Sequence, residues 1–184
     1  VDLFRSHFFD PESWTLGEYF DNNWKPAAGE RGAWTEPGHH FEWASLLVDF
    51  AARSGQQDLN GFARKLYASA IANGLNRATG LAYGAVSREG LPLDGVSRSW
   101  PQTEAVKAAI ALGRTGGPDM KPEIEERVGR LFRWHIDPAP TGLWVDRIDE
   151  RGRSRATEVP ASIFYHLVCA LTQYLDCTAG AARQ

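Results

Sequence analysis

Cysteine is scarce in this chain of 184 residues, and long apolar runs are absent. Its two cysteines, Cys169 and Cys177, are eight positions apart in one predicted helix, too far along the axis for a disulfide. We therefore expect buried free thiols, a reducing compartment and a cytoplasmic location. No run of about 18 apolar residues occurs, and no charged-then-apolar leader precedes the first predicted helix. Neither membrane insertion nor secretion is predicted.

An excess of charge of one sign is also missing. The formal net charge is −3 and the basic residues are scattered, so the sequence lacks the electrostatic footprint of a nucleic-acid-binding protein. A small or neutral partner is favoured instead. With 43% hydrophobic and 11% aromatic residues, residues 1–184 can form a single domain with a core. The opening, "VDLFRSHFF" from Val1, has the pattern of the middle of an element, and we expect a piece of a longer protein.

Apolar residues with the spacing of one helix face predict five helices. They cover Phe41–Arg53, Leu59–Asn73, a segment from Ser99 to the turn at 114–117, Ile124–His135, and a segment from Pro160 through Leu175. Ser99 and Gln102 have the spacing of a capping box. The last helix is apolar around much of its circumference, which predicts that protein surrounds it.

A repeat of about 60 residues organises these helices. Pro37, Pro101 and Pro160 each lead a helix and follow one another after 64 and 59 residues. Stretches 79–90 and 141–152 both begin Thr-Gly-Leu and end in glycine, the pattern of short β-hairpins. Because one helical hairpin cannot bury its apolar face alone, the sequence predicts an all-α fold of stacked hairpins with short β-hairpin loops.

Polar residues gather in the first turns of the proline-led helices, where equivalent stacking would bring them together at a pocket. They are His39, His40 and Glu42; Gln102, Thr103 and Glu104; and Ser162 and His166. His39 and Glu42 share a helix face, so Glu42 either orients His39 for proton transfer or both only stabilise the helix start. His166 either lines a cavity or is a hydrogen-bonded core residue. We expect a structural role for His40 and His135.

Two histidines and a carboxylate, His39, Glu42 and His166, are a known type of metal-ligand set, but the spacing lacks the HExxH pattern, and no metal site is expected. Tryptophans near the loop–helix junctions either stack on a sugar or pack in the core. They are Trp34, Trp43, Trp100 and Trp144. Arg31 and Arg98 precede proline-led helices and either grip a hydroxyl, carboxylate or phosphate or are simply solvated.

Three motifs resemble the N-acylglucosamine 2-epimerase superfamily, which includes sugar 2-epimerases and mannose isomerases. They are "PGHHFEWASLL", "SWPQTEAVKA" and "PASIFYHL", with "GLWVDRIDERG" before the last. The resemblance implies an (α/α)6 barrel of six helical hairpins with the sugar at the loop end. The chain would form about half of it, the C-terminal half.

The resemblance also implies the chemistry. His39 and His166 match the two histidines that act as general acid and base on an opened sugar, through a cis-enediolate. Glu42 and Glu104 match sugar-binding or ring-opening carboxylates, and Trp100 matches an aromatic of the site wall. The family site also takes an arginine and a further histidine from the N-terminal half, which no position here supplies. No redox cofactor and no metal is implied.

The wording of "EPGHHFEW" and "VPASIFYH" is closer to the mannose isomerase branch, so we expect an aldose–ketose isomerase acting on mannose, its 6-phosphate or a related sugar. Arg31, Arg98 and Trp144 are further candidates for binding it. A sugar 2-epimerase and a non-catalytic sugar-binding half-barrel are the alternatives. A glycoside hydrolase is least favoured, because hydrolysis calls for two carboxylates flanking the bond. The sequence leaves homodimerisation open.

Overall fold

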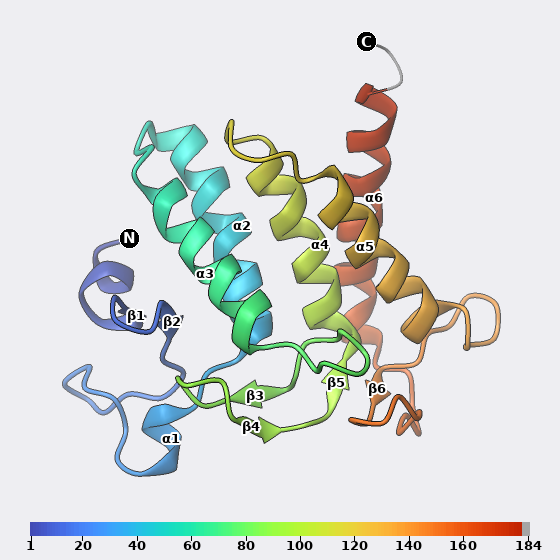
Figure 1. Cartoon of the computed structure of the whole chain (residues 1–184), viewed down its shortest axis with the longest axis horizontal. Helices are drawn as coiled ribbons and strands as arrows, with labels where there is room; N and C mark the ends of the chain where they lie inside the picture. Colours follow the sequence, from blue (N-terminus) through green and yellow to red (C-terminus); the bar gives the residue numbers. More distant parts are fainter. Residues whose placement is uncertain (182–184) are drawn as a thin grey trace.

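Long helices make up most of the chain, as the sequence predicts. The computed structural model describes residues 1–181 (Figure 1). Its long helices are α2 (Pro37–Ser54), α3 (Leu59–Asn73), α4 (Ser99–Gly113), α5 (Lys121–Leu131) and α6 (Phe164–Ala181). Shorter helical segments are η1 (Phe4–Phe8), α1 (Glu30–Ala33), η2 (Phe132–Ile136) and η3 (Ala161–Ile163). The all-α prediction is confirmed, and none of the helices within 1–181 is long and apolar enough to cross a membrane.

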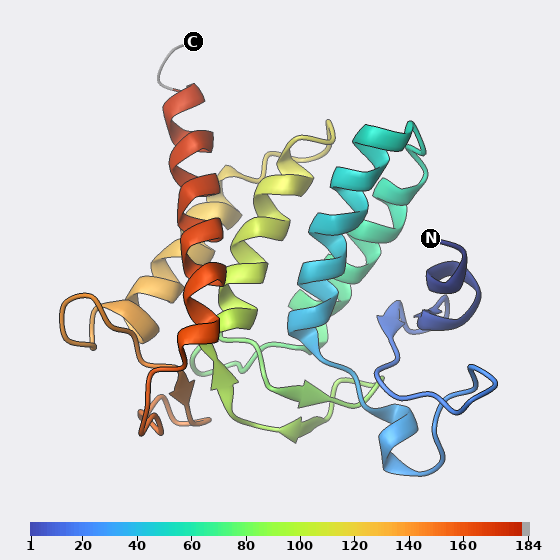
Figure 2. The same cartoon turned by 180° about the vertical axis from the view of Figure 1, so that it is seen from behind.

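The helices form two layers. In the inner row, α4 packs against α2 on one side and α6 on the other, while α3 packs on α2 and α5 on α4 (Figures 1 and 2). All three inner helices begin at the end of the molecule that carries β3 to β6 (Figure 2). This arrangement confirms the predicted repeat, because α2 and α4 have Pro37 and Pro101 in their first turns and Pro160 leads η3, which runs directly into α6.

Short antiparallel strand pairs join these helices. They are β1 (Phe9–Asp10) with β2 (Thr15–Leu16), β3 (Ala85–Val86) with β4 (Pro92–Asp94), and β5 (Ser97–Arg98) with β6 (Arg147–Ile148). Of the predicted hairpin at 79–90, the turn that ends at Gly90 and the first strand, β3, are present, but the second strand, β4, lies beyond the predicted stretch. The second predicted hairpin is only partly right. The bridge between Ile148 and Ser154, with backbone hydrogen bonds from Asp149 to Arg153 and from Arg155 to Arg147, folds residues 147–155 on themselves, but the strand partner of β6 is β5. Local turn patterns cannot reveal a partner some 50 residues away.

Small side chains make the inner row compact. Ala105, Ala108 and Ala109 of α4 are fully or almost fully buried, in the same cluster as Phe41 of α2 and Leu66 of α3. Alanine keeps helix axes close, so α4 can be enclosed by neighbours on several sides. A second, smaller cluster of Leu131, Trp144, Ile163 and Leu167 lies where α6 begins.

Two predictions about α6 are wrong. Apolar residues of this helix are exposed, namely Phe164, Tyr165, Val168 and Leu175, and so are Cys169 and Cys177. The helix is the last of the inner row, with α4 on one side only (Figure 2). Periodicity indicates that a face is apolar, but it cannot say whether the chain itself covers that face.

The predicted capping box at the start of α4 does not form either. The Ser99 hydroxyl donates to Asp146 Oδ1 at 2.8 Å, and the Gln102 amide donates to the Arg98 carbonyl at 3.0 Å. Gln102 Oε1 also accepts from the Ala82 backbone N–H at 3.0 Å. Both side chains therefore hold loops against α4, a role that tertiary neighbours impose.

His40 has the structural role expected from the sequence. Its side chain is fully buried, and Nε2 accepts the Leu16 backbone N–H at 2.9 Å, which ties the N-terminal loop to α2. Burial lowers the pKa of His40 to about 3, so the imidazole is neutral at physiological pH. His135 is similarly buried, and its Nδ1 donates to the Val145 carbonyl at 2.6 Å.

His40 should make stability depend on pH. Its pKa is lower in the folded than in the unfolded state, so the unfolded chain binds more protons below about pH 6.5 and stability falls as pH decreases. In His40→Gln, the slope between pH 6.5 and 5 should be shallower by up to about 1.4 kcal/mol per pH unit. Urea unfolding across this range measures it, with exposed His7→Gln as the control. Equal slopes in wild type and His40→Gln would contradict the assignment.

Candidate active site

One aromatic or imidazole ring from each inner helix meets at the loop end of the row. The rings of His39 (α2) and Trp100 (α4) have centroids 5.2 Å apart, and those of Trp100 and His166 (α6) are 5.8 Å apart. The indole therefore lies between the two imidazoles. The predicted convergence of the helix starts is observed for these residues.

Gly38 makes this arrangement fit. A Cβ atom built at Gly38 would lie 2.5 Å from an atom of the Trp100 ring, closer than real Cβ contacts allow. Glycine thus permits the indole to rest directly on the first turn of α2. The "PGHH" motif carries this requirement, which is recognisable once the position of Trp100 is known.

His39 is held by acidic residues that sequence reasoning missed. Its Nδ1 lies 2.9 Å from Glu18 Oε2 and 3.7 Å from Glu36 Oε2. Burial alone would lower the pKa of His39, but the hydrogen bond to Glu18 and the charges of Glu18, Glu36 and Glu42 outweigh it and raise that pKa. Glu18 therefore has the orienting role that the sequence assigns to Glu42, which acts on His39 through its charge. Glu18 is 21 residues away, beyond any helical spacing.

His166 has a carboxylate partner of its own. Its Nδ1 lies 2.7 Å from Glu104 Oε1, and Glu104 is fully buried. Lys107, one turn along α4, donates to both Glu104 oxygens at 2.9 and 2.8 Å. The buried carboxylate is thus compensated, and it accepts the Nδ1 proton of His166. Nε2 of His166 is left as the ring nitrogen that can take up or release a proton.

A hollow opens beside His39. Its volume is about 410 Å³, and the carboxylates of Glu18 and Glu42 lie in its wall. Aromatic side chains complete the lining, among them Phe8, Phe20, Trp24 and Trp43. The volume is in the range of small-molecule sites, and aromatic faces beside carboxylates suit a polyhydroxylated ligand.

The other predicted site residues have different positions. Arg98 lies just before α4, where its charge helps to lower the pKa of Glu36, against the larger effect of burial, which raises it. Arg31 instead stacks on the Tyr19 ring at 4.4 Å. Trp144 is buried in the cluster of Leu131, Ile163 and Leu167, so it has a packing role. Neither belongs to the row of His39, Trp100 and His166.

Within residues 1–181, the donors close enough to share a cation are Glu18, Glu36 and His39, with ligand atoms within 4.8 Å of one another. This group differs from the set of His39, Glu42 and His166 considered from the sequence. The hydrogen bond between His39 and Glu18 already accounts for its closeness.

The model of the N-acylglucosamine 2-epimerase (GlcNAc 2-epimerase) family matches residues 1–170. The chain belongs to this family. It is 34% identical to a mannose-6-phosphate isomerase of Rhizobium meliloti (strain 1021), over 95% of the chain and 46% of that protein. It is also 34% identical to a D-mannose isomerase of Pseudomonas cannabina pv. alisalensis, over 54% of the chain and 28% of that protein. The chain spans less than half the length of these relatives.

Solved structures support the same fold. A crystal structure of D-mannose isomerase has a TM-score of 0.77 and 22% identity, covering 89% of this chain and 45% of that one. Cellobiose 2-epimerase from Bacillus thermoamylovorans B4167 also has a TM-score of 0.77, with 19% identity, covering 95% and 45%. The chain therefore has the helical-hairpin architecture of part of an (α/α)6 barrel, as predicted.

Replacing Glu18 should change the titration of His39. In Glu18→Gln the hydrogen bond to a charged acceptor is lost, so the pKa of His39 should fall, and by more than in Glu42→Gln, which removes charge alone. NMR titration of the imidazole signals, assigned with His39→Gln, measures both shifts. Exposed Glu12→Gln is the control. A larger fall in Glu42→Gln would make Glu42 the principal partner.

Gly38→Ala should force the Trp100 indole away from α2 and destabilise the fold by about 1–3 kcal/mol, the usual cost of overpacking. The matched control is Gly61→Ala in α3, where an added Cβ meets nothing within 4 Å and helix propensity predicts a gain of about 0.5–1 kcal/mol. Denaturant unfolding compares the two. An unchanged free energy of unfolding in Gly38→Ala would mean that the Trp100 indole can move aside at little cost.

Proposed function

We propose that this chain provides the proton-transfer residues of a sugar isomerase acting on mannose or a related aldose. The observation that carries the proposal is the placement of two histidines, each with its own carboxylate, on either side of Trp100. Membership of a sugar epimerase family and the names of the two mannose isomerase relatives point to the same chemistry.

Aldose–ketose isomerisation needs a base and an acid. One histidine takes the proton from carbon 2 of the opened sugar, giving a cis-enediolate, and a proton is then delivered to carbon 1. The proton at carbon 2 is weakly acidic, so the base must be well placed and the developing oxyanion stabilised. The sugar is rearranged with no net oxidation, so the step requires no redox cofactor.

The two histidines are prepared differently for this work. The raised pKa of His39 keeps it protonated to higher pH than a free imidazole, which suits an acid. His166 is oriented by buried Glu104, with Nε2 as its reactive nitrogen. In the proposed site, Trp100 contacts the sugar face, Glu42 accepts sugar hydroxyls in the hollow beside His39, and Arg98 binds a substrate oxygen.

A 2-epimerase is the second candidate, favoured by the fold likeness to cellobiose 2-epimerase. The two reactions share the enediolate and differ in where the proton returns. Delivery to carbon 1 isomerises the sugar, whereas delivery to the opposite face of carbon 2 epimerises it. The names of the sequence relatives favour isomerisation.

His39→Gln and His166→Gln should each reduce turnover about 10²–10⁴-fold while leaving the fold intact, because each removes a proton-transfer group. The measurement is proton NMR of the natural protein with mannose in deuterated water, which reports deuterium entry and the identity of the product. Circular dichroism checks the fold, and exposed His7→Gln is the matched control.

Several outcomes are decisive. Ketose carrying deuterium at carbon 1 supports isomerisation, and a labelled epimer supports the second candidate. Near-normal turnover in either histidine variant would remove that residue from the mechanism. Sugar binding without deuterium exchange would leave a non-catalytic, sugar-binding protein.

A further inference from the structure

Three arginines lie in register across the small sheet beside the proposed site. Arg98 of β5 pairs with Arg147 of β6. Ile148 forms an antiparallel bridge with Ser154, so the residues next to this bridge, Arg147 and Arg155, also lie opposite each other. A backbone hydrogen bond from Arg155 N–H to the Arg147 carbonyl, 2.8 Å long, supports this register. Cross-strand partners project to the same face, so the three guanidinium groups form one row, here called the arginine ladder.

The ladder is electrostatically unfavourable by itself. Like charges directly opposite one another on a sheet repel, and sheets usually pair opposite charges or neutral residues. Two aspartates lie beside the ladder: Asp146, whose Oδ2 is 3.5 Å from Arg98 Nε and 3.9 Å from Arg147 Nε, and Asp149, 3.1 Å from Arg155 Nε. Asp149 also pairs with Arg153 at 3.0 Å. Positive charge therefore remains in excess along this face.

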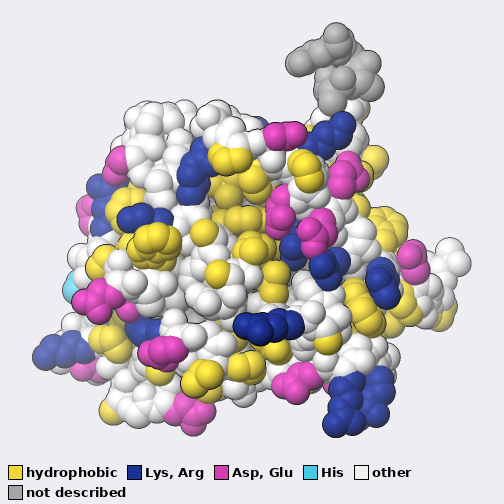
Figure 3. All heavy atoms as spheres, viewed as in Figure 1, with side chains coloured by type: hydrophobic (Ala, Val, Ile, Leu, Met, Phe, Trp, Pro, Cys, Tyr) yellow, Lys and Arg dark blue, Asp and Glu magenta, His cyan; other side chains and the backbone are white. Residues whose placement is uncertain are grey.

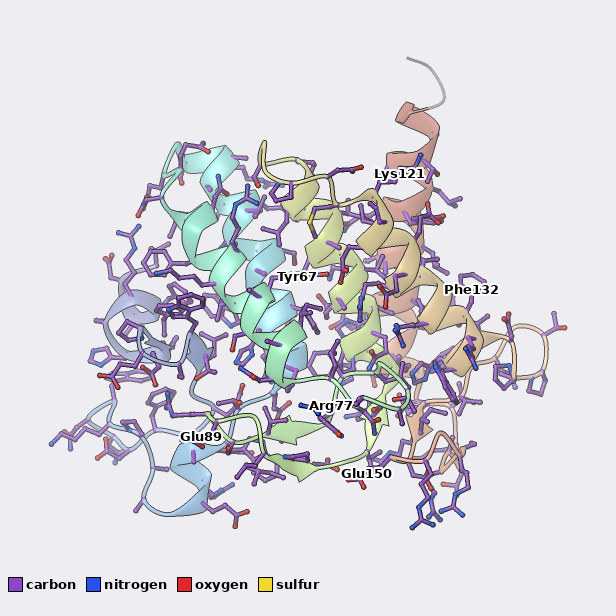
Figure 4. The ribbon with its side chains drawn as sticks, viewed as in Figure 1. Tyr67, Arg77, Glu89, Lys121, Phe132 and Glu150 are labelled. Atoms are coloured by element: carbon purple, nitrogen blue, oxygen red, sulfur yellow. The ribbon has the colours of Figure 1, made fainter. Side chains whose placement is uncertain are left out.

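The guanidinium groups are also accessible. The side chains of Arg98, Arg147 and Arg155 are 38%, 56% and 59% exposed. Figure 3 shows Lys and Arg side chains gathered at the edge of the molecule below β6, and Figure 4 shows nitrogen-tipped side chains projecting there, beyond the labelled Glu150. Although each of the three arginines contacts an aspartate, part of each side chain is therefore still accessible to a ligand.

The ladder leads towards the proposed active site. Arg98 is two residues before Trp100, and Glu36, whose carboxylate lies 3.7 Å from His39, is close enough for the Arg98 charge to offset part of the rise in pKa that burial causes there. Arg147 and Arg155 then extend outward, with about 5 Å between neighbouring Cβ atoms.

We propose that the arginine ladder binds the anionic group of a phosphorylated hexose, so that the site prefers a sugar phosphate to the neutral sugar. Guanidinium groups bind phosphate oxygens in a bidentate manner, and adjacent forks suit a group with three terminal oxygens. The role in substrate preference rests on the proposed function. Anion binding itself rests only on the geometry of the sheet.

The test compares two double variants that remove equal charge. Arg147→Gln with Arg155→Gln disrupts the ladder. The control, Arg53→Gln with Arg114→Gln, changes two exposed arginines at the C-terminal ends of α2 and α4, whereas the proposed site lies at the N-terminal ends of these helices. Binding of mannose 6-phosphate, mannose and inorganic phosphate is measured by calorimetry at low and physiological salt.

We expect wild type to bind mannose 6-phosphate more tightly than mannose. The ladder variant should lose about tenfold or more of that preference, and the control should keep it, because each charged hydrogen bond contributes about a factor of ten. Higher salt should weaken the preference in wild type. Inorganic phosphate should compete with mannose 6-phosphate. Equal affinities in wild type, or equal losses in both double variants, would overturn the proposal.

The outcomes separate the two proposals. Phosphate-dependent binding that the ladder variant loses, without deuterium exchange into any sugar, would support the ladder and reject the isomerase. Turnover of mannose with no preference for its phosphate would do the reverse. Failure of wild type to bind either sugar or phosphate would count against both.

Discussion

The enclosure of α4 between α2 and α6 is the constraint on which the rest of the structure depends. Its buried alanines let both neighbours approach closely, and the row of three parallel helix starts follows from that packing. Trp100, in the first turn of α4, is consequently placed between His39 and His166. Gly38 shows how tight the fit is, because even one methyl group would meet the indole.

Two histidine–carboxylate pairs in one site experience different environments. Glu104 is fully buried, and its carboxylate is paired with Lys107 and hydrogen-bonded to His166, so this pair is held from two sides. Glu18 and His39 lie at the wall of the hollow, partly exposed, where nearby carboxylates raise the pKa of His39. Environment rather than residue type thus distinguishes the two imidazoles.

Exposed apolar residues at both ends of the inner row are consistent with the chain covering less than half of its relatives. Leu46 and Phe50 of α2 and Val168 and Leu175 of α6 are exposed at the two ends of the row. In an (α/α)6 barrel, these are the edges where further hairpins continue the ring, and the solved relatives are more than twice as long as the matched part. An apolar groove of about 590 Å³ lies outside the row, between α3 and α5, where the Tyr67 hydroxyl donates to Glu123 at 2.9 Å (Figures 3 and 4).

Local signals were sufficient for the helices, the repeat and the three rings of the row. Apolar periodicity placed α3 at its observed bounds, and proline spacing identified the inner helices. Likewise, the motifs singled out His39, Trp100, Glu104 and His166, because each motif consists of residues close together in the chain.

Tertiary structure alone decided the partners: Glu18 for His39, β5 for β6, and Asp146 for Ser99. It also decided that Trp144 packs in the core and that the α6 face is exposed. Each of these three pairs joins residues that are far apart in the chain. Local spacing rules describe neighbours along a helix or strand, so they cannot predict which distant residue will contact a given position.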